Sequence, residues 1–389
     1  MVGHWVATWA AMPMLTEPAD LPPHPYVADG VAFADATLRQ TFRVSLGGGR
    51  IRLRLTNAFG DCPLPIAAVT VALPAGGAVG VGAIEPETAR TVTFHGRPSV
   101  VVAAGAPVLS DPLDIDLAPR SALAVTAYLA QGQPAGAVTS HPGSRTTSHV
   151  LAGNRVADAD LAGAARVDHW YFLGGVEVWA PAATEVVALL GDSLTDGRGS
   201  TTNGNDRWPD QLLDRLPGGV AMINQAGGGN RVLNDGLGPS ALARLDRDIL
   251  AQSGVRRLVV FEGVNDIGTA AATEAAQKQV VADLVAAYEQ IVERARARGI
   301  RVYGATITPF GGGGGYDDPG GHREGARQAV NRWIREGGTF EAVFDFDAAV
   351  RDPADPRRLL PAYDEGDHLH INPAGYGAIA AAVPAGAFA

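Results

Sequence analysis

The sequence predicts an all-β domain followed by an α/β domain with a parallel sheet. At 389 residues the chain is longer than one domain usually is. From about residue 35 to 180, short segments with β character are separated by turns rich in Gly and Pro. Beyond Pro181, longer apolar segments alternate with helical patterns, which indicates βαβ units. We therefore expect an accessory domain over 1–182 and a catalytic domain over 183–389.

The first half of the chain has the pattern of a β-sandwich or jelly roll. Residues 50–55 alternate at period two, as a half-buried strand should. Several further short strands at similar spacing favour a sandwich or jelly-roll architecture. Residues 131–166 are rich in Gly, Ala, Ser and Asp without a clear period, so we expect a long connection or flap there. The other predicted strands are 69–71, 91–94, 114–117 and 123–128.

The second half predicts a five-stranded parallel sheet covered by helices on both faces. The clearest helical pattern spans 275–297, with apolar residues on one face. A last helix is expected after Asn372, which suits the N-cap, with Pro373 at the first helical position. The predicted strands are 185–190, 220–224, 257–262, 300–306 and 341–346.

Composition excludes several classes of protein. The formal net charge of -10 argues against a nucleic-acid binder, which normally carries a basic face. The single cysteine, Cys62, rules out an internal disulfide framework. No apolar run approaches the ~20 residues that span a bilayer. The N-terminus lacks a basic segment followed by an apolar stretch, so we expect a cytoplasmic protein or a secreted one whose leader has been removed.

Lys278 is the only lysine in the chain. A Ser-Lys dyad, a Schiff base or a phosphate-binding loop would each have to use it. It lies within the predicted helix 275–297, far in sequence from any glycine loop. These three chemistries are therefore disfavoured.

Polar residues follow each predicted strand of the second half. In parallel sheets, ligands bind beyond the carboxyl ends of the strands, so these residues should form the functional site. One serine, three asparagines, a glycine cluster and several acids meet at that edge. The residues in these positions are Asp192 and Ser193, Asn224 to Asn230, Gly263 to Asp266, Thr308 to Phe310, and Asp345 to Asp347.

Ser193 has the partners that a nucleophilic serine needs. A hydroxyl becomes nucleophilic when a base removes its proton. His370 can be that base, with Asp367 three residues earlier to orient it, as in the Ser-His-Asp arrangement. The oxyanion of a tetrahedral intermediate could be bound by the backbone N–H groups of Ser193 and Gly229 and by the side-chain amide of Asn265. No metal ion or cofactor is required.

The sequence around Ser193 is not the α/β-hydrolase elbow. That motif is Gly-x-Ser-x-Gly, whereas this chain has Gly191 to Leu194 as Gly-Asp-Ser-Leu, followed by Thr195. The chain instead resembles the SGNH, or GDSL, hydrolase family, whose four motif blocks all have counterparts here in the right order. The blocks match Gly191 to Leu194, Gly229 within Asn224 to Asn230, Gly263 to Asp266, and Asp367 to His370.

This resemblance covers about residues 184–389 and implies a flavodoxin-like three-layer α/β/α fold with metal-free ester hydrolysis. It implies that Ser193 is the nucleophile, that Gly229 and Asn265 are oxyanion donors, and that Asp367 and His370 complete the triad. Asp192, Gly263 and Asp266 are expected to support these groups. The first half looks like the jelly-roll domain that precedes the catalytic domain in some members, including certain carbohydrate esterases.

Alternatives remain at several positions. Gly228 could replace Gly229, because three consecutive glycines leave the register uncertain by one, and His368 is a rival to His370 as the base. Asp345 and Asp347 fit structural hydrogen bonding better than chemistry. The acids near His370 lack the second His/Cys cluster that a metal site would need. The segment 311–318 is interpreted as a mobile wall of the substrate pocket, and Trp5 and Trp9 as core or domain-packing residues rather than a sugar platform.

The predicted function is hydrolysis of carboxylic esters of small or medium acyl groups through an acyl-enzyme on Ser193. The alternatives within this chemistry are a carbohydrate O-acetylesterase, similar to acetylxylan esterases, and a lysophospholipase or thioesterase. The expected partner is a small-molecule ester, including acylated carbohydrates or lipids. A hypothesis from another class is a glycan-binding protein with an inactive hydrolase scaffold.

Overall fold

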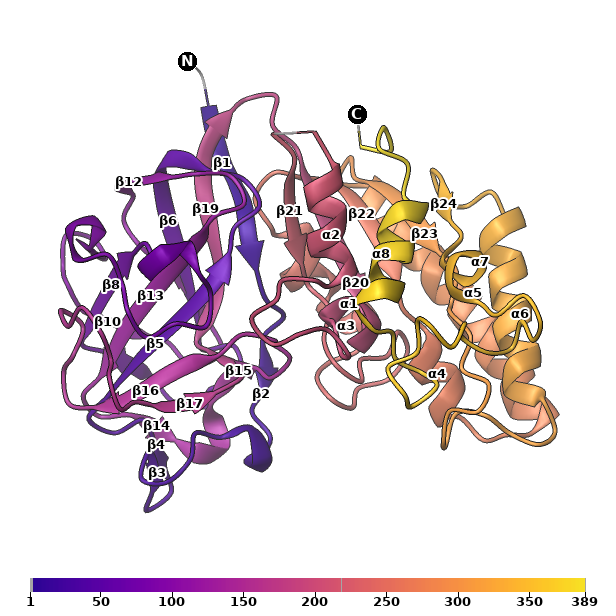
Figure 1. Ribbon diagram of the computed structural model, residues 1–389, viewed down its shortest axis with the longest axis horizontal. Coiled ribbons are helices and arrows are strands. Elements are labelled where there is room, and N and C mark those ends of the chain that lie inside the picture. Colours follow the sequence, from indigo (N-terminus) through magenta and orange to yellow (C-terminus); the bar gives the residue numbers. More distant parts are fainter. Residues whose placement is uncertain (1–2, 218, 389) are drawn as a thin grey trace. The chain divides into compact units, whose positions relative to one another are not determined.

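The computed structural model describes residues 3–217 and 219–388 (Figure 1). The chain forms two compact units, residues 1–184 and 185–389. The first unit is built from β-strands and short 3₁₀ turns, and the second alternates strands with helices. The change in sequence pattern near Pro181 therefore falls at the join between the two units.

Antiparallel sheets form the first unit, and two of them are large. One has six strands in the order β17-β16-β5-β13-β8-β9, and the other joins β1-β19-β6-β11 with β12 also paired to β6. The first contains β5 (Ala36–Arg43), β8 (Ala68–Ala72), β9 (Arg90–Thr91), β13 (Ala122–Leu129), β16 (Ser148–Ala152) and β17 (Ala165–Val167). The second contains β1 (Gly3–Ala10), β6 (Gly48–Thr56), β11 (Pro107–Leu109), β12 (Leu113–Leu117) and β19 (Leu173–Pro181).

Short strands and turns complete the first unit. Three small sheets have the orders β14-β4-β3, β18-β15-β2 and β10-β7. Their strands are β2 (Met14–Leu15), β3 (Val27–Ala28), β4 (Val31–Ala32), β7 (Leu64–Ile66), β10 (Val100–Val102), β14 (Gln133–Pro134), β15 (Thr139–His141) and β18 (Trp170–Tyr171). The 3₁₀ turns are η1 (Pro18–Asp20), η2 (Ala75–Gly77), η3 (Pro86–Thr88) and η4 (Ala135–Ala137).

Aromatic packing joins the two large sheets of this unit. The ring of Trp9, on β1, stacks on Phe42 of β5 with centroids 3.9 Å apart. Trp170 meets Trp9 edge-on at 4.9 Å. Trp9 is buried, so it belongs to the core between the sheets. Trp5 instead pairs edge-on with the half-exposed Trp179, and the guanidinium of Arg52 lies 4.6 Å from its ring centroid.

The prediction of a long connection over 131–166 is wrong. This segment contains β14, η4, β15 and β16 and the start of β17, and β16 lies between β17 and β5 in the six-stranded sheet. Its strands are short and contain buried polar residues such as Ser148 and His149. They therefore lack the apolar alternation by which a half-buried strand is recognised.

The second unit contains a five-stranded parallel sheet in the order β21-β20-β22-β23-β24. All six residues of β20 are buried, so both faces of this strand are covered. Every end of these strands lies within two residues of the predicted range. They are β20 (Val186–Gly191), β21 (Ala221–Asn224), β22 (Val255–Phe261), β23 (Arg301–Ala305) and β24 (Val343–Phe344).

The helices of this unit fall into two packed sets (Figure 1). In one set α8 packs on α2 and α7, and in the other α5 packs on α3, α4 and α6. None of the helices in the described residues is long and apolar enough to cross a bilayer. The helices are α1 (Ser193–Asp196), α2 (Trp208–Arg215), α3 (Ala241–Leu245), the π-helical turn η5 (Asp246–Leu250), α4 (Val264–Thr269), α5 (Glu274–Arg296), α6 (His322–Glu336), α7 (Phe346–Val350) and α8 (Pro373–Ala382).

Candidate active site

The turn after β20 places Ser193 at the first position of α1. Gly191 ends the strand, and a Cβ there would lie 2.7 Å from Thr195 Cβ and 2.8 Å from the Phe261 carbonyl oxygen. Asp192 caps the helix, because its Oδ1 accepts the Leu194 N–H at 3.0 Å. The strand end and the cap together fix the backbone of Ser193, which is 7% exposed.

Ser193, His370 and Asp367 form a continuous hydrogen-bonded chain. Ser193 Oγ lies 2.8 Å from His370 Nε2, and His370 Nδ1 lies 2.7 Å from Asp367 Oδ2. A carboxylate only accepts, so Nδ1 carries the imidazole proton and Nε2 is free to accept the serine proton. Asp367 Oδ1 also accepts the Leu369 N–H at 3.0 Å, which fixes the carboxylate within its own loop.

The electrostatic environment keeps His370 neutral. Burial lowers the pKa of His370 below its ordinary value, and the hydrogen bond and charge of Asp367 offset this only in part. Partial burial opposes ionisation of Asp367, but its hydrogen bonds from His370 outweigh that effect and hold its pKa below the usual range. At neutral pH the site therefore has a neutral imidazole beside an ionised carboxylate, the state in which a histidine can accept a proton.

The start of α8 anchors the loop that carries the histidine. Asn372 Oδ1 accepts the Gly375 N–H at 3.0 Å, and Pro373 is the first helical residue, both as predicted. The Asn372 side chain also donates to the carbonyls of Ala362 and Asp364. His370 thus lies between its carboxylate partner and a capped helix.

The glycine turn after β21 leaves one backbone donor free. The Gly227 N–H donates to the Gly191 carbonyl at 3.1 Å, and the Gly228 N–H donates to Asp196 Oδ2 at 3.1 Å. In the described part of the chain, the N–H groups of Gly229 and Ser193 have no acceptor. Gly229 has a φ of 72°, which favours glycine. This arrangement favours Gly229 over Gly228 as an oxyanion donor.

Asn265 is tied to the same turn. Its Nδ2 donates to the Asn230 carbonyl at 2.8 Å, and the second hydrogen of that amide has no acceptor among the described residues. Asp266 accepts the N–H groups of Val232 and Leu233 at 2.8 and 2.9 Å. One hydrogen bond thus joins the third motif block to the second, and two more join it to the residues just beyond the second block.

Gly263 permits the turn between β22 and α4. Its φ is 127°, in a region that residues with a side chain rarely adopt. A Cβ there would lie 2.5 Å from the Tyr288 hydroxyl oxygen, which in turn donates to the Glu262 carbonyl at 2.7 Å. Glycine is therefore required at this position both for the backbone conformation and for the packing.

Arg244 is a buried residue of this region that no sequence motif indicated. Its guanidinium donates to Asn230 Oδ1 at 2.9 Å, to the Gly191 carbonyl at 3.3 Å and to the Gln225 carbonyl at 2.5 Å. Glu262, also fully buried, lies 3.8 Å away. Arg244 thus links the end of β20, the turn after β21 and the end of β22. It lies in an ordinary helical segment, so only the three-dimensional contacts could reveal it.

Two buried acids of this region, Asp192 and Glu262, have raised pKa values. Burial raises the pKa of Asp192 to about 7, helped by the negative charges of Asp266 and Asp196. Burial raises the pKa of Glu262 to about 8 in spite of Arg244. Asp192 Oδ2 and both carboxylate oxygens of Glu262 have no hydrogen-bond partner among the described residues. These acids are therefore wholly or partly protonated at neutral pH.

Two groups of predicted candidates lie outside the catalytic chain. His368 is half-exposed, and its Nδ1 bonds Asp364 Oδ2 at 2.5 Å rather than Ser193. Asp347 pairs with the buried Arg327 at 2.6 Å, and Asp345 pairs with Arg335 at 2.7 Å. Asp345 and Asp347 are thus engaged in ion pairs. No three His, Cys, Asp or Glu side chains in the described ranges are grouped so as to hold a metal ion.

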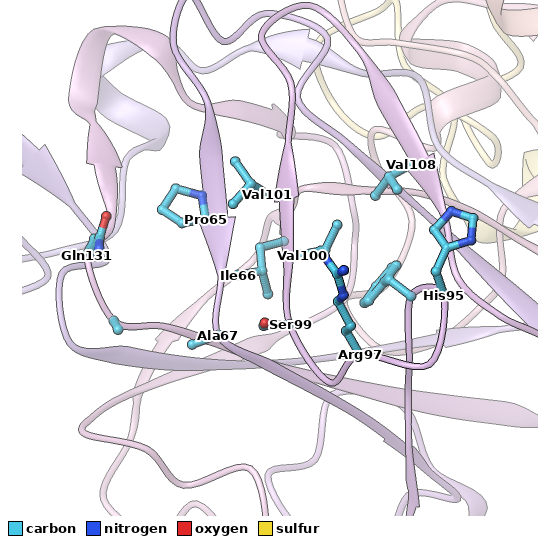
Figure 2. A pocket seen from close by; sticks show the side chains of 12 residues that line it. Pro65, Ile66, Ala67, His95, Arg97, Ser99, Val100, Val101, Val108 and Gln131 are labelled. Atoms are coloured by element: carbon cyan, nitrogen blue, oxygen red, sulfur yellow. The ribbon is translucent and has the colours of Figure 1, made fainter.

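A separate cavity of about 510 Å³ lies in the first unit (Figure 2). Its wall is largely aliphatic, formed by side chains such as Ile66, Val100 and Val108, with His95 and Arg97 also lining it. Its volume is in the range of small-molecule sites. None of the residues of the catalytic chain lines it.

The parallel sheet and the serine chain at its carboxyl edge define a hydrolase of α/β architecture. Residues 189–378 match the sequence model of the GDSL-like Lipase/Acylhydrolase family. The second unit of this chain therefore belongs to that family, as its motif blocks predicted.

Solved structures resemble about half of the chain, although no curated protein matches the sequence. A putative acylhydrolase from Bacteroides fragilis is 20% identical, with 51% of this chain and 85% of that one covered and a TM-score of 0.37. A catalytic mutant of an acetylxylan esterase from Geobacillus stearothermophilus is 20% identical, with 51% and 91% covered and a TM-score of 0.38. A putative arylesterase from Agrobacterium tumefaciens is 23% identical, with 51% and 95% covered and a TM-score of 0.36.

Proposed function

We propose that this protein hydrolyses carboxylic esters through an acyl-enzyme on Ser193. The observation that carries the proposal is the hydrogen-bonded chain from Ser193 Oγ through His370 to Asp367, with distances of 2.8 and 2.7 Å. The lowered pKa of His370 supports it, because the imidazole must be neutral to accept the serine proton.

In the first half of the reaction, Ser193 Oγ attacks the ester carbonyl carbon as its proton passes to His370 Nε2. Asp367 stabilises the imidazolium that forms and holds its tautomer. The carbonyl oxygen becomes an oxyanion, which the N–H groups of Ser193 and Gly229 and the amide of Asn265 bind. Collapse of the tetrahedral intermediate breaks the ester C–O bond. The departing alcohol takes the proton from His370, and the acyl group remains on Ser193.

In the second half, water attacks the acyl carbon and gives a proton to His370 Nε2. The second tetrahedral intermediate uses the same oxyanion donors, and its collapse returns the proton to Ser193 Oγ and releases the acid. Each oxyanion donor contributes about 3–4 kcal/mol to the stability of the transition state.

The proposed substrates are esters of small or medium acyl groups. Within this chemistry, acetylated carbohydrates come next, followed by lysophospholipids or thioesters. We assign the catalytic role to residues 183–389 and an accessory role to the jelly-roll-like residues 1–182. A rate series over acyl chain lengths, measured beside acetylated sugars, selects among these substrates.

The first test is Ser193→Ala. We expect the variant to keep its fold and to lose both hydrolysis of p-nitrophenyl acetate and labelling by a fluorophosphonate. Ser240→Ala is a matched control, because it removes a buried serine of the same unit that caps α3 and does not contact His370. It should keep both activities at a stability cost of about 1 kcal/mol.

Retention of most hydrolysis by Ser193→Ala contradicts the proposal. A wild-type protein that folds, fails to react with the fluorophosphonate and binds glycans through its first unit supports the glycan-binding alternative. The cavity of the first unit gives little support to glycan binding, because its wall is largely aliphatic and offers few polar side chains for sugar hydroxyls.

A further inference from the structure

Tyr316 forms a hydrogen bond with the amide that is expected to bind the oxyanion. It lies in the glycine-rich segment between β23 and α6, and its hydroxyl is 2.6 Å from Asn265 Oδ1. The rest of the Asn265 side chain is directed to Asn230, whose carbonyl accepts from Nδ2 at 2.8 Å. The asparagine amide is therefore held at both ends, by a backbone carbonyl and by a tyrosine.

The chemistry of these groups fixes the direction of each hydrogen bond. The Asn230 carbonyl can only accept, so the nitrogen of the amide must face it. Oδ1 then faces Tyr316, and the tyrosine hydroxyl must donate. Burial raises the pKa of the Tyr316 hydroxyl above its ordinary value, so it keeps its proton well into the alkaline range. A donor on Oδ1 polarises the amide and strengthens its remaining N–H as a donor.

Gly268, on α4, makes room for the tyrosine ring. A Cβ at Gly268 would collide with Cδ1 and Cε1 of Tyr316. The backbone of Gly268 is not in the left-handed region, and alanine is preferred to glycine inside a helix. The tyrosine ring is thus the feature that accounts for glycine at this position.

Several contacts hold the segment that carries Tyr316. Arg323 donates to the Gly315 carbonyl at 2.8 Å and to the Ala270 carbonyl at 2.9 Å, which ties the segment to the end of α4. Asp317 accepts the Gly312 N–H at 2.8 Å. These tethers differ from the mobile wall expected from the glycine content of 311–318. They hold the segment against the helix that carries Asn265.

We propose that Tyr316 is a positioning residue of the oxyanion hole: its hydroxyl orients and polarises the Asn265 amide, so that the free N–H of that amide is directed to the oxyanion. The inference rests on the proposed function of Ser193. The segment 311–318 would thereby help to stabilise the transition state through Asn265, without itself touching the substrate ester.

The main test is Tyr316→Phe, which removes the hydroxyl and keeps the ring on Gly268. We expect kcat for p-nitrophenyl acetate to fall about 3- to 10-fold with KM unchanged, because the amide is less well oriented in the transition state. The free energy of unfolding should fall only modestly, because Asn265 Oδ1 loses one donor. Tyr128→Phe is the matched control: it removes a tyrosine hydroxyl bonded to Asp35 Oδ1 at 2.7 Å in the first unit. It should keep the wild-type kcat.

A double-variant cycle tests whether Tyr316 acts through Asn265. Asn265→Ala should lower kcat about 10²- to 10³-fold, as loss of one oxyanion donor does. In that background, Tyr316→Phe should cause no further fall, because no amide is left to orient. If the kcat of the double variant falls by the product of the two single decreases, Tyr316 acts independently of Asn265. That result would overturn the inference.

Gly268→Ala provides a second route to the same result. The added methyl group displaces the ring, so kcat should fall at least as much as in Tyr316→Phe. In the variant that carries both changes, the fold decrease in kcat should be smaller than the product of the two single decreases. A wild-type kcat in Gly268→Ala or in Tyr316→Phe overturns the inference while fluorophosphonate labelling of Ser193 still supports the proposed function. If the wild-type protein shows neither labelling nor hydrolysis, the proposed function itself fails.

Discussion

The buried carboxyl of Asp192 should make the second unit less stable as the pH rises. Its pKa is raised from 3.8 in the unfolded chain to about 7 in the folded protein. Between these two values the folded state retains a proton that the unfolded state has lost, so the free energy of unfolding falls with increasing pH. About 3 pKa units at 1.36 kcal/mol each give a total loss of about 4 kcal/mol, complete above pH 7.

Asp192→Asn removes this titration and keeps the local structure. Asparagine accepts the Leu194 N–H as aspartate does and is an equally good N-cap. We expect the variant to match the wild type near pH 4 and to be more stable by up to about 4 kcal/mol at pH 8. The charge of Asp192 also contributes to the raised pKa of the fully buried Glu262, so the difference between the two proteins measures the titration of Asp192 together with its coupling to Glu262.

Urea unfolding at pH 5, 6, 7 and 8 measures this difference. Amide hydrogen exchange in β20 assigns the transition to the second unit, because the two units need not unfold together. Asp283→Asn removes an exposed carboxyl from α5 and should leave the wild-type pH dependence unchanged. Parallel stability curves for the wild type and Asp192→Asn would refute the assignment of a raised pKa to this carboxyl.

Three further outcomes are expected. The acid limb of the pH profile of kcat/KM should have its midpoint below pH 6.5, because burial lowers the pKa of His370. A measured midpoint above pH 6.5 would contradict this. Arg244→Met should destabilise the second unit by about 3–5 kcal/mol in denaturant unfolding at pH 8, since it leaves Glu262 and three other acceptors without their buried partner. Gly229→Ala should cost about 1–2 kcal/mol of stability because its φ is 72°, whereas Gly228→Ala, whose Cβ would come no closer than 3.7 Å to a neighbouring atom, should be nearly neutral.

The sequence predicted the second unit well because its signals are local. The strand β20 is a continuous apolar run that ends at a small polar turn, and α5 buries a regular apolar face from Leu284 to Ala295. Asn372 and Pro373 mark the start of α8 by their own side-chain chemistry. Elements of this kind can be recognised within a window of about 11–18 residues.

Features that depend on distant contacts could not be predicted. Arg244 receives its role from Gly191, Gln225 and Asn230, and the Tyr316 hydrogen bond from the position of Asn265. Arg244 lies in no distinctive local pattern, and the glycine run that precedes Tyr316 does not indicate the partner of its hydroxyl. In the first unit, β16 was missed because its buried residues are partly polar, and its membership of the sheet depends on pairing with β5.

The two hydrogen bonds of the catalytic chain differ greatly in sequence separation. Asp367 and His370 are three residues apart and can meet within a single loop, whereas Ser193 and His370 are 177 residues apart. During refolding, the acid–base pair can form early, but the serine acquires its base only when the C-terminal segment docks, with α8 packed on α2. Reactivity toward a fluorophosphonate should therefore return late and report completion of the whole unit.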